Sequence, residues 1–360
     1  MPSSLLRALL FRRAAAAALA ATAALALVAW ALQVVRVAPE VLTSDTPGAL
    51  VAQVVFLPLV PIVSFVLPVA LAAGILVAGR RLRAEGTLDA LAAAGIAPRR
   101  IGTPFLALVL LAAGVAGGAA LVGEPLAFGA LRDAAPTLAA AAFSGRAAPG
   151  SFAPAGPGTD VYVGRRDLDA WRDVLLVRRG APGDVTELAA AALRLADTPG
   201  DGIALELRDG TIRSATRDGV VTASFARLRL PFDVQALRSR IEAMLPAGMA
   251  APPSAVFDAA TLGTASPRDR YLVLRRWAAP LQAILFGLFA AGLALRPAGT
   301  IRGALVLAAV VVLTHALLRL LEPAAAGGPA PPWAAVLAPH APAALAAALA
   351  LTRLYLAKPV

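Results

Sequence analysis

Six long runs of apolar residues constrain the fold of this chain more than any other feature. Each holds about 20 residues or more, enough for a helix rising 1.5 Å per residue to cross the roughly 30 Å hydrocarbon core of a membrane. Hydrophobic residues make up 59% of the sequence and its mean hydropathy is +0.75, well above soluble norms. We therefore predict an α-helical integral membrane protein with six transmembrane helices, at about residues 14–35, 50–79, 101–122, 272–295, 303–321 and 333–356.

Basic residues lie at alternate ends of these runs. The first run is longer than the roughly 7 to 15 residues of a secretory signal core, so we expect a retained span. Arg275 and Arg276 fall at the outer end of the fourth span and disagree with the pattern, but snorkelling would accommodate them. The positive-inside rule predicts cytoplasmic termini. The residues predicted to be cytoplasmic are Arg7, Arg12, Arg13, Arg80, Arg81, Arg83, Arg99, Arg100, Arg296, Arg302 and Lys358.

Prolines and glycines modify the second and third spans. The second span should bend, because its prolines remove backbone donors; they are Pro58, Pro61 and Pro68. The third span should end near residue 124 and pack closely against other helices through Gly114, Gly117 and Gly118. These features predict bent, closely packed helices.

The region from residue 124 to about residue 270 has a different character. Charged residues, prolines and glycines are frequent there, and no run of about 18 apolar residues occurs. Short β-like stretches fall at 160–163, 173–177, 186–196, 203–208, 211–215 and 220–230, and residues 235–249 are predicted to be helical. Asp209-Gly210 and Asp218-Gly219 are typical hairpin turns. We predict an all-β periplasmic domain, a sandwich or jelly-roll-like sheet, inserted between helices 3 and 4.

The domain boundaries follow from these assignments. Residues 1–123 hold transmembrane helices 1–3, residues 124–270 hold the β-domain and a connector, and residues 271–360 hold transmembrane helices 4–6. A charged segment at residues 80–100 separates the second span from the third. We refer to it as the island.

The island contains a predicted short helix at residues 88–94, within a coupling segment of about 84–95. Thr87 is a possible N-cap, Gly95 can take the left-handed conformation that ends a helix, and Pro98 prevents its continuation. Leu88 and Leu91 lie on one side of the helix. With the acidic residues Glu85 and Asp89 at its start, this helix suits docking to a partner; the alternative is an ordinary capped loop.

Several kinds of chemistry are excluded. The chain contains no cysteine, so it has no disulfide, thiol nucleophile or iron–sulfur ligand. Its only lysine, Lys358, is not preceded by the glycines of a phosphate-binding Walker loop. The two histidines, His315 and His340, form neither a metal motif nor a Ser-His-Asp arrangement. The net charge of +11 is topological rather than a nucleic-acid footprint, because the arginines are spread over span ends and the middle domain.

A polar face occurs inside the fifth span. His315, Arg319 and Glu322 are spaced i, i+4 and i+7 and so share one side of a helix. Polar residues within a span usually face protein or water. They predict either the lining of a substrate path or a structural ion pair near the headgroups. His340, at the start of the sixth span, is predicted to be structural.

The layout resembles that of the LptF/LptG permeases of the lipopolysaccharide export system, over nearly the whole chain. The motifs that carry the resemblance are Leu67-Pro68, Ala94-Gly95-Ile96, residues 205–210 (LELRDG) followed by Phe225 and Leu228–Asp233, Leu295-Arg296-Pro297 and Pro331-Pro332-Trp333. Thr87 stands where the family normally has an acidic residue, with Glu85 and Asp89 two positions to either side. The chain is slightly nearer the LptF type.

The resemblance implies a permease subunit that extracts lipopolysaccharide from the inner membrane and passes it to a periplasmic bridge. It implies no enzymatic activity and no cofactor in this chain. The implied partners are a dimeric LptB-like ABC ATPase, a second six-span permease, single-span LptC-like and periplasmic LptA-like proteins, lipopolysaccharide and membrane lipids. Arg36 matches a basic position that contacts lipid A phosphates, and the neighbouring position that the family often fills with lysine is Gln33 or Val34 here. The residues implied in ATPase coupling are Glu85, Thr87, Leu88, Asp89, Leu91 and Gly95.

Two other readings stay open at this point. Another ABC-type permease, lipoprotein-releasing or mechanotransmitting, would usually have four spans with its large domain after the first. A membrane-anchored scaffold would use the β-domain only to bind partners. An integral membrane enzyme ranks last, since no catalytic constellation is visible.

Overall fold

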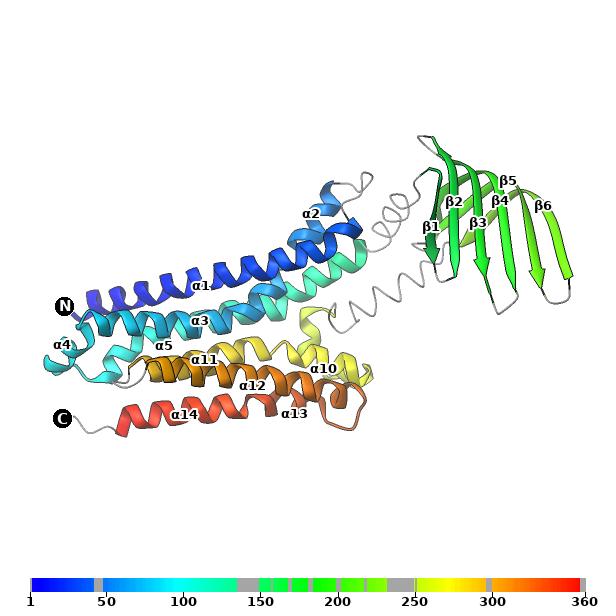
Figure 1. Cartoon of the computed structure of the whole chain (residues 1–360). Coiled ribbons are helices and arrows are strands. Elements are labelled where there is room, and N and C mark those ends of the chain that lie inside the picture. The colour runs from blue at the N-terminus through cyan, green and yellow to red at the C-terminus, as the bar shows by residue number, and fades with distance from the viewer. Residues whose placement is uncertain are drawn as a thin grey trace. The chain divides into compact units, whose positions relative to one another are not determined.

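The computed structural model describes residues 2–41, 48–134, 149–156, 158–167, 170–180, 184–198, 202–216, 219–231, 249, 251–295 and 300–356. The predicted helix at 235–249 lies almost wholly outside them, as do Arg296 and Lys358. The chain divides into two compact units, a helical unit and a sheet unit (Figure 1). The helical unit comprises Met1–Gln33, Leu57–Gly129 and Pro246–Val360, and the sheet unit comprises Val34–Phe56 and Ala130–Leu245.

Apolar helices account for most of the chain outside the sheet. In order they are α1 (Pro2–Val41), α2 (Gly48–Phe56), α3 (Leu59–Ala84), α4 (Thr87–Ala93), α5 (Pro98–Gly118), the π-helical segment η1 (Ala119–Gly123), the 3₁₀ turn η2 (Pro253–Val256), α9 (Ala259–Thr264), α10 (Pro267–Arg275), α11 (Ala278–Ala294), α12 (Thr300–Ala326), α13 (Pro332–Leu337), the 3₁₀ turn η3 (Ala338–His340) and α14 (Ala341–Leu356). The predicted helical membrane architecture is therefore present.

Five helical stretches among the described residues are long and apolar enough to cross a membrane. They are Leu5–Arg36, Gly48–Ala84, Arg100–Ala134, Arg302–Ala326 and Pro332–Thr352. The predicted fourth span is instead a pair of helices, α10 and α11, that meet at a bend of 41°. Six spans result only if this bent pair counts as one.

The second and third spans differ in detail from the prediction. In the second, the helix is interrupted at Leu57-Pro58, between α2 and α3, and Pro68 lies inside α3, while the expected bend stays a prediction. The third span does not end near residue 124. The π-helical segment η1 accommodates the change in backbone pitch and the helix continues to residue 134.

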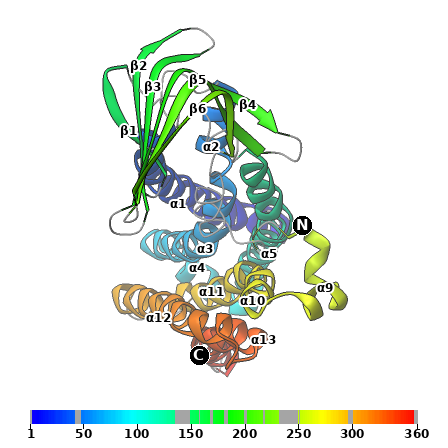
Figure 2. The same cartoon turned by 90° about the vertical axis from the view of Figure 1, so that its right-hand side faces the viewer.

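The centre of the helical unit is formed by α3, α5 and α11, with α14 packed on α11 (Figure 2). Of the predicted glycines, Gly114 and Gly118 face open space, whereas an added Cβ at Gly117 would lie 3.5 Å from Pro280 of α11. The closest helix contacts occur elsewhere. An added Cβ would lie 2.4 Å from the backbone of Ala18 at Gly74, 2.5 Å from Ala294 at Gly79, 2.6 Å from Val109 at Gly287 and 2.6 Å from Ala350 at Gly292. Glycine thus brings α1 and α11 against α3, and α5 and α14 against α11.

The sheet unit holds one antiparallel sheet of six strands in sequential order. The strands are β1 (Ser151–Gly156), β2 (Thr159–Arg166), β3 (Trp171–Arg179), β4 (Val185–Thr198), β5 (Gly202–Thr216) and β6 (Gly219–Pro231). The predicted β-sheet region is confirmed, whereas the jelly roll is not, since the described strands form a single meander. The sequence reading missed β1 and divided β5 into two strands.

The division of β5 arose from Asp209-Gly210, which is not a turn. Asp209 has a left-handed backbone (φ +49°) in the middle of β5. The prediction was wrong because aspartate tolerates this conformation within a strand as well as in a hairpin turn. By contrast, Gly219 pairs with Thr216, so β5 and β6 form the predicted hairpin, although Asp218 itself lies outside the described residues.

One row of residues interrupts the pairing across the sheet. Gly164, Asp173, Ala191, Asp209 and Ala226 face one another on β2 to β6, yet none joins the regular ladder, while the register is the same on both sides of the row. Asp173 also has positive φ (+54°). We call this row the crease.

The crease changes which residues point into the apolar core. Within each half of a strand, side chains point alternately into and away from the core, so core residues are an even number of positions apart. Across the crease they are an odd number of positions apart. The pairs are Trp171 and Val174 on β3, Ala190 and Leu193 on β4, Leu207 and Ile212 on β5, and Phe225 and Leu228 on β6. The long strands, which curve in Figure 2, thereby keep apolar side chains on the same face on both sides of the crease.

Candidate functional site

The island folds into the predicted short helix, α4, with a different start. Gly86, with left-handed φ (+67°), precedes it, and no side chain caps it, so Thr87 is the first helical residue and not the N-cap. Gly95 ends it with φ +71°, as predicted. The amides of Gly95 and Ile96 donate to the carbonyls of Ala92 (2.9 Å) and Leu91 (3.0 Å), a Schellman ending that fixes the helix.

The coupling residues separate into an inward and an outward set. Leu88 is buried and Leu91 half-buried against the core of the helical unit, so the apolar side of α4 packs on its own spans. Glu85 accepts a hydrogen bond from Arg13 of α1. Asp89 is exposed in the first turn of α4 and has no ion pair within the described chain. Thr87 is half-buried and Gly95 exposed. The outward acidic group of the helix is therefore Asp89.

The three polar residues of the fifth span, α12, do not line one common path, because they make separate contacts. The Glu322 carboxylate accepts from Arg319 (3.3 Å) and from Arg275 of α10 (3.5 Å), an ion-pair cluster that joins two helices. The His315 ring instead packs edge-on against Phe65 of α3 (centroids 5.0 Å apart), and its Nδ1 lies 2.8 Å from the Val311 carbonyl. The geometry matches the structural ion pair for Arg319 and Glu322. His340 is buried on η3, with Nδ1 2.8 Å from the carbonyl of Val336.

Arg276 is turned into the protein rather than snorkelling. Its side chain is 4% exposed and its guanidinium donates to the carbonyls of Ala251 (2.8 Å), Met249 (3.1 Å) and Pro252 (3.4 Å). The expectation failed because these carbonyls come from a connector whose path the sequence does not predict. The arginine ties that connector to the bend between α10 and α11.

A polar contact that the sequence reading missed joins the second and third spans. Ser64 donates to the carboxylate of Glu124, which directly follows the π-helical segment, and the Ser64 hydroxyl also lies 3.0 Å from the Pro61 carbonyl. The sequence signal that could have predicted this contact is an acidic residue, Glu124, close to the end of an apolar run. The pair crosslinks the two spans beside the prolines of the second.

Arg36 and Gln33 lie near the end of the first span on α1, three residues apart and so on neighbouring positions of the helix surface. Arg36 is exposed and Gln33 partly exposed. Arg36 has no ion pair within the described part of the chain.

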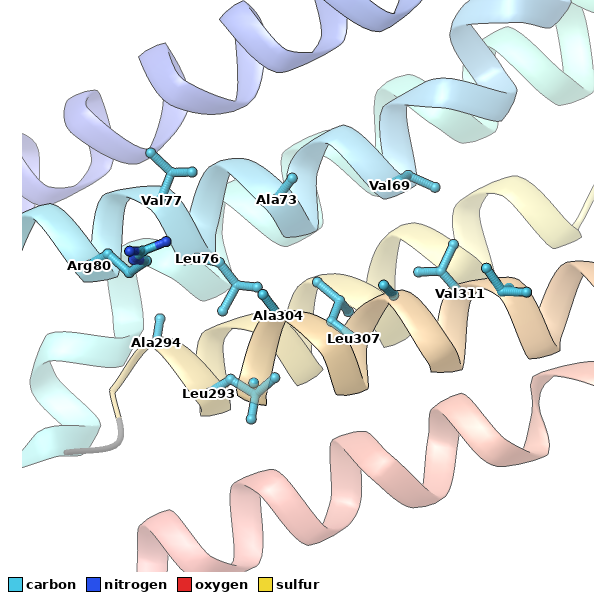
Figure 3. Close-up of a pocket in the computed structure, with 13 residues that line it drawn as sticks. Val69, Ala73, Leu76, Val77, Arg80, Leu293, Ala294, Ala304, Leu307 and Val311 are labelled. Carbon is cyan, nitrogen blue, oxygen red and sulfur yellow. The ribbon is translucent and has the colours of Figure 1, made fainter. Parts of the chain in front are cut away.

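An apolar groove of about 360 Å³ lies between α3 and α12, with α11 at its base (Figure 3). Small side chains along α3 and α12 leave the space. Arg80 supplies its one charged group, at the end of the groove nearest the island. The lining residues are Val69, Ala73, Leu76, Val77, Arg80, Leu293, Ala294, Gly303, Ala304, Leu307, Ala308, Val311 and Val312.

This arrangement has no catalytic constellation among the described residues, and no group of three His, Asp or Glu side chains there could hold a metal. Residues 8–355 match the family described as the lipopolysaccharide export system permease LptF/LptG. The chain belongs to the LptF/LptG family. Among curated proteins, none matches the sequence significantly.

Membership of the LptF/LptG family makes the chain a multi-pass inner-membrane permease of lipopolysaccharide export, and not itself an enzyme. It also implies partnership with the ATPase and other components of that system. The order of helices, inserted sheet and helices agrees with this family over nearly the whole chain.

Proposed function

We propose that the chain is one of two paired six-span permeases that form a lipid-accepting cavity and move lipopolysaccharide when a separate ABC ATPase closes. The observation that carries this proposal is the LptF/LptG match across residues 8–355, combined with an island helix whose outward face keeps an unpaired acid. In this reading the island end of the bundle and both termini are cytoplasmic and the sheet is periplasmic.

The least buried spans support pairing through the first and fifth. Only 11% of the most apolar window of the first span and 17% of that of the fifth are buried, against 44% in the third. Leu32 and Val35 of α1 and Val312 and Leu320 of α12 are each about two-thirds exposed. Apolar faces of this kind face lipid or a second chain, and the proposed cavity lies where the two permeases face each other.

The contacts of α4 provide a mechanical route. An ATPase pushing on Asp89 would move α4, and with it the spans against which Leu88 and Leu91 pack. The Glu85–Arg13 contact would carry the same movement to α1. Gly86 and Gly95 set the two ends of the helix, with Thr87 as its first residue.

The substrate path in this proposal uses Arg36, with Gln33 beside it, to bind lipid A phosphates at the outer end of α1. Arginine suits this role because its guanidinium binds phosphate oxygens with two parallel hydrogen bonds. Arg319, 74% exposed, is a second phosphate contact, held in place by Glu322. The sheet's apolar face would receive acyl chains and pass them towards the LptC-like and LptA-like bridge.

We also propose that the chain is of the LptF type.

The test compares Asp89→Lys with Glu85→Gln. Reversing the outward charge should lower co-purification of the ATPase at least tenfold, since a like-charge contact at an interface costs several kcal/mol. Glu85→Gln should keep the ATPase bound but reduce lipid release in vesicles, because only the link to α1 is broken. Normal assembly and normal release for Asp89→Lys would remove the island from the mechanism.

A further inference from the structure

We propose that the groove between α3 and α12 binds one acyl chain of an anionic membrane phospholipid, whose phosphate is bound by Arg80. This inference rests on the orientation in the proposed function, in which the island end faces the cytoplasmic leaflet. It concerns a different ligand from the exported lipopolysaccharide and a different end of the spans from Arg36.

The chemistry of the lining fits a lipid. All lining residues except Arg80 are apolar, and a polar ligand would leave its hydrogen bonds unmade along most of the groove. Arg80 is exposed at the groove's end and has no ion pair within the described residues. Glu85, the acidic residue nearest in sequence, already accepts from Arg13. The groove therefore combines an apolar channel with a cation that lacks a counter-charge.

A second cation lies at the same end. Arg83 donates from Nη2 to the carbonyl of Ala294, a residue of the groove lining (3.4 Å). Its Nε is buried and has no hydrogen-bond partner in the described part of the chain. Two guanidinium groups close to one opening favour a phosphate over a zwitterionic or neutral headgroup.

The length of the groove matches one leaflet. From Val69 to Arg80 the lining of α3 extends over 11 residues, about 17 Å at 1.5 Å per residue. That is close to half of the roughly 30 Å hydrocarbon core. An acyl chain whose headgroup lies at Arg80 would thus reach the middle of the bilayer.

The groove is narrow. Its volume is about 360 Å³. A single flexible chain can lie inside this space, whereas a helix about 10 Å wide could cover the groove but not enter it.

Photo-crosslinking of the full-length chain, co-expressed with its partners, tests the proposal. The protein is placed in phosphatidylcholine vesicles containing phosphatidylglycerol with a photoactivatable acyl chain, and labelled peptides are mapped. Label is expected on the parts of the two helices that line the groove, from Val69 to Arg80 on α3 and from Gly303 to Val312 on α12. Arg80→Gln should lower it about tenfold, since a charge-assisted contact is lost, and Ala304→Phe should block the chain sterically.

Arg81→Gln is the matched control, because Arg81 is exposed one residue away but does not line the groove. Equal labelling in Arg80→Gln and Arg81→Gln, label spread evenly over all spans, or competition by lipopolysaccharide and not by unlabelled phosphatidylglycerol would each overturn the proposal. Size-exclusion profiles confirm folding of the variants. Loss of ATPase co-purification from the unmodified chain would refute the proposed function and leave the labelling result standing.

Discussion

The two units treat a buried charge in different ways. In the helical unit, the buried guanidinium of Arg276 donates to three backbone carbonyls. In the sheet, the carboxylate of Glu206 is only 6% exposed, but its partners Arg208 and Arg229 are 42% and 65% exposed. A charge within a lipid-facing bundle must be satisfied by protein, whereas arginines at a water-facing sheet remain hydrated.

The sheet keeps more positive charge than its acids neutralise. On the face opposite the apolar core, Arg165, Arg172, Arg208 and Arg227 lie in one cross-strand row. Arg194 and Arg229 flank Glu206 in another. Water makes this surplus tolerable, and the same density of arginines inside the helical unit would be prohibitive.

The largest expected effect is that of Arg276→Met. Three buried carbonyls would lose their donor at once, so we expect a loss of about 3 kcal/mol or more in unfolding free energy. Arg275→Met is the control, because Arg319 still pairs with Glu322, and should cost about 1 kcal/mol. Thermal unfolding of the purified chain in detergent measures both. Similar costs for the two variants would show that the connector does not depend on Arg276.

Replacement of Glu206 should produce a smaller effect that depends on pH. The hydrogen bond from Arg208, with that from Arg229, lowers the pKa of Glu206 below its ordinary value of 4.5. Its contribution to stability is thus present above pH 4.5 and is lost as the pH falls through the lowered pKa. Denaturant titrations followed by Trp171 fluorescence, with the other tryptophans replaced, should show this loss. In Glu206→Gln the acid-dependent part should disappear, and an unchanged pH profile would contradict the assignment.

Asp209→Gly should stabilise the sheet. Glycine adopts the left-handed conformation of this position without the cost of a side chain, which predicts a gain of up to about 1 kcal/mol. Asp209→Ala, which keeps the strain and loses aspartate's tolerance of it, should destabilise. The same fluorescence titration compares them. Equal midpoints would mean that the crease stores no backbone strain.

The smallest effect is expected for Arg227→Gln. Arg227 lies 3.7 Å from Glu206 and is 59% exposed, so Arg208 and Arg229 suffice without it. The change should stay within about 0.5 kcal/mol. A larger loss would mean that the third arginine is not surplus, and the contrast with Arg276 would weaken.

The sequence predicted what depends on local pattern. The spans follow from apolar run length, the ending of α4 from Gly95, and the last hairpin from Asp218-Gly219. The sequence did not predict which groups pair with the charged side chains. The partners of Arg276, Glu322 and Glu124 come from distant segments. The sequence also misplaced the close glycine contacts, since Gly74 and Gly114 both follow Leu-Ala-Ala and yet only Gly74 has another helix packed against it.

The crease also protects the alignment of the strands. In a regular sheet, a strand that slides by two residues still presents its apolar side chains to the core, so only one-residue slips are strongly opposed. Here each strand from β3 to β6 reverses its alternation at one position, and those positions coincide. If one strand slipped by two residues, its crease position would no longer face the crease position of its neighbour. The residues between these two positions would then point to the wrong face of the sheet. The positive-φ residues Asp173 and Asp209, which lie at these positions, therefore favour a single register in strands of up to 15 residues.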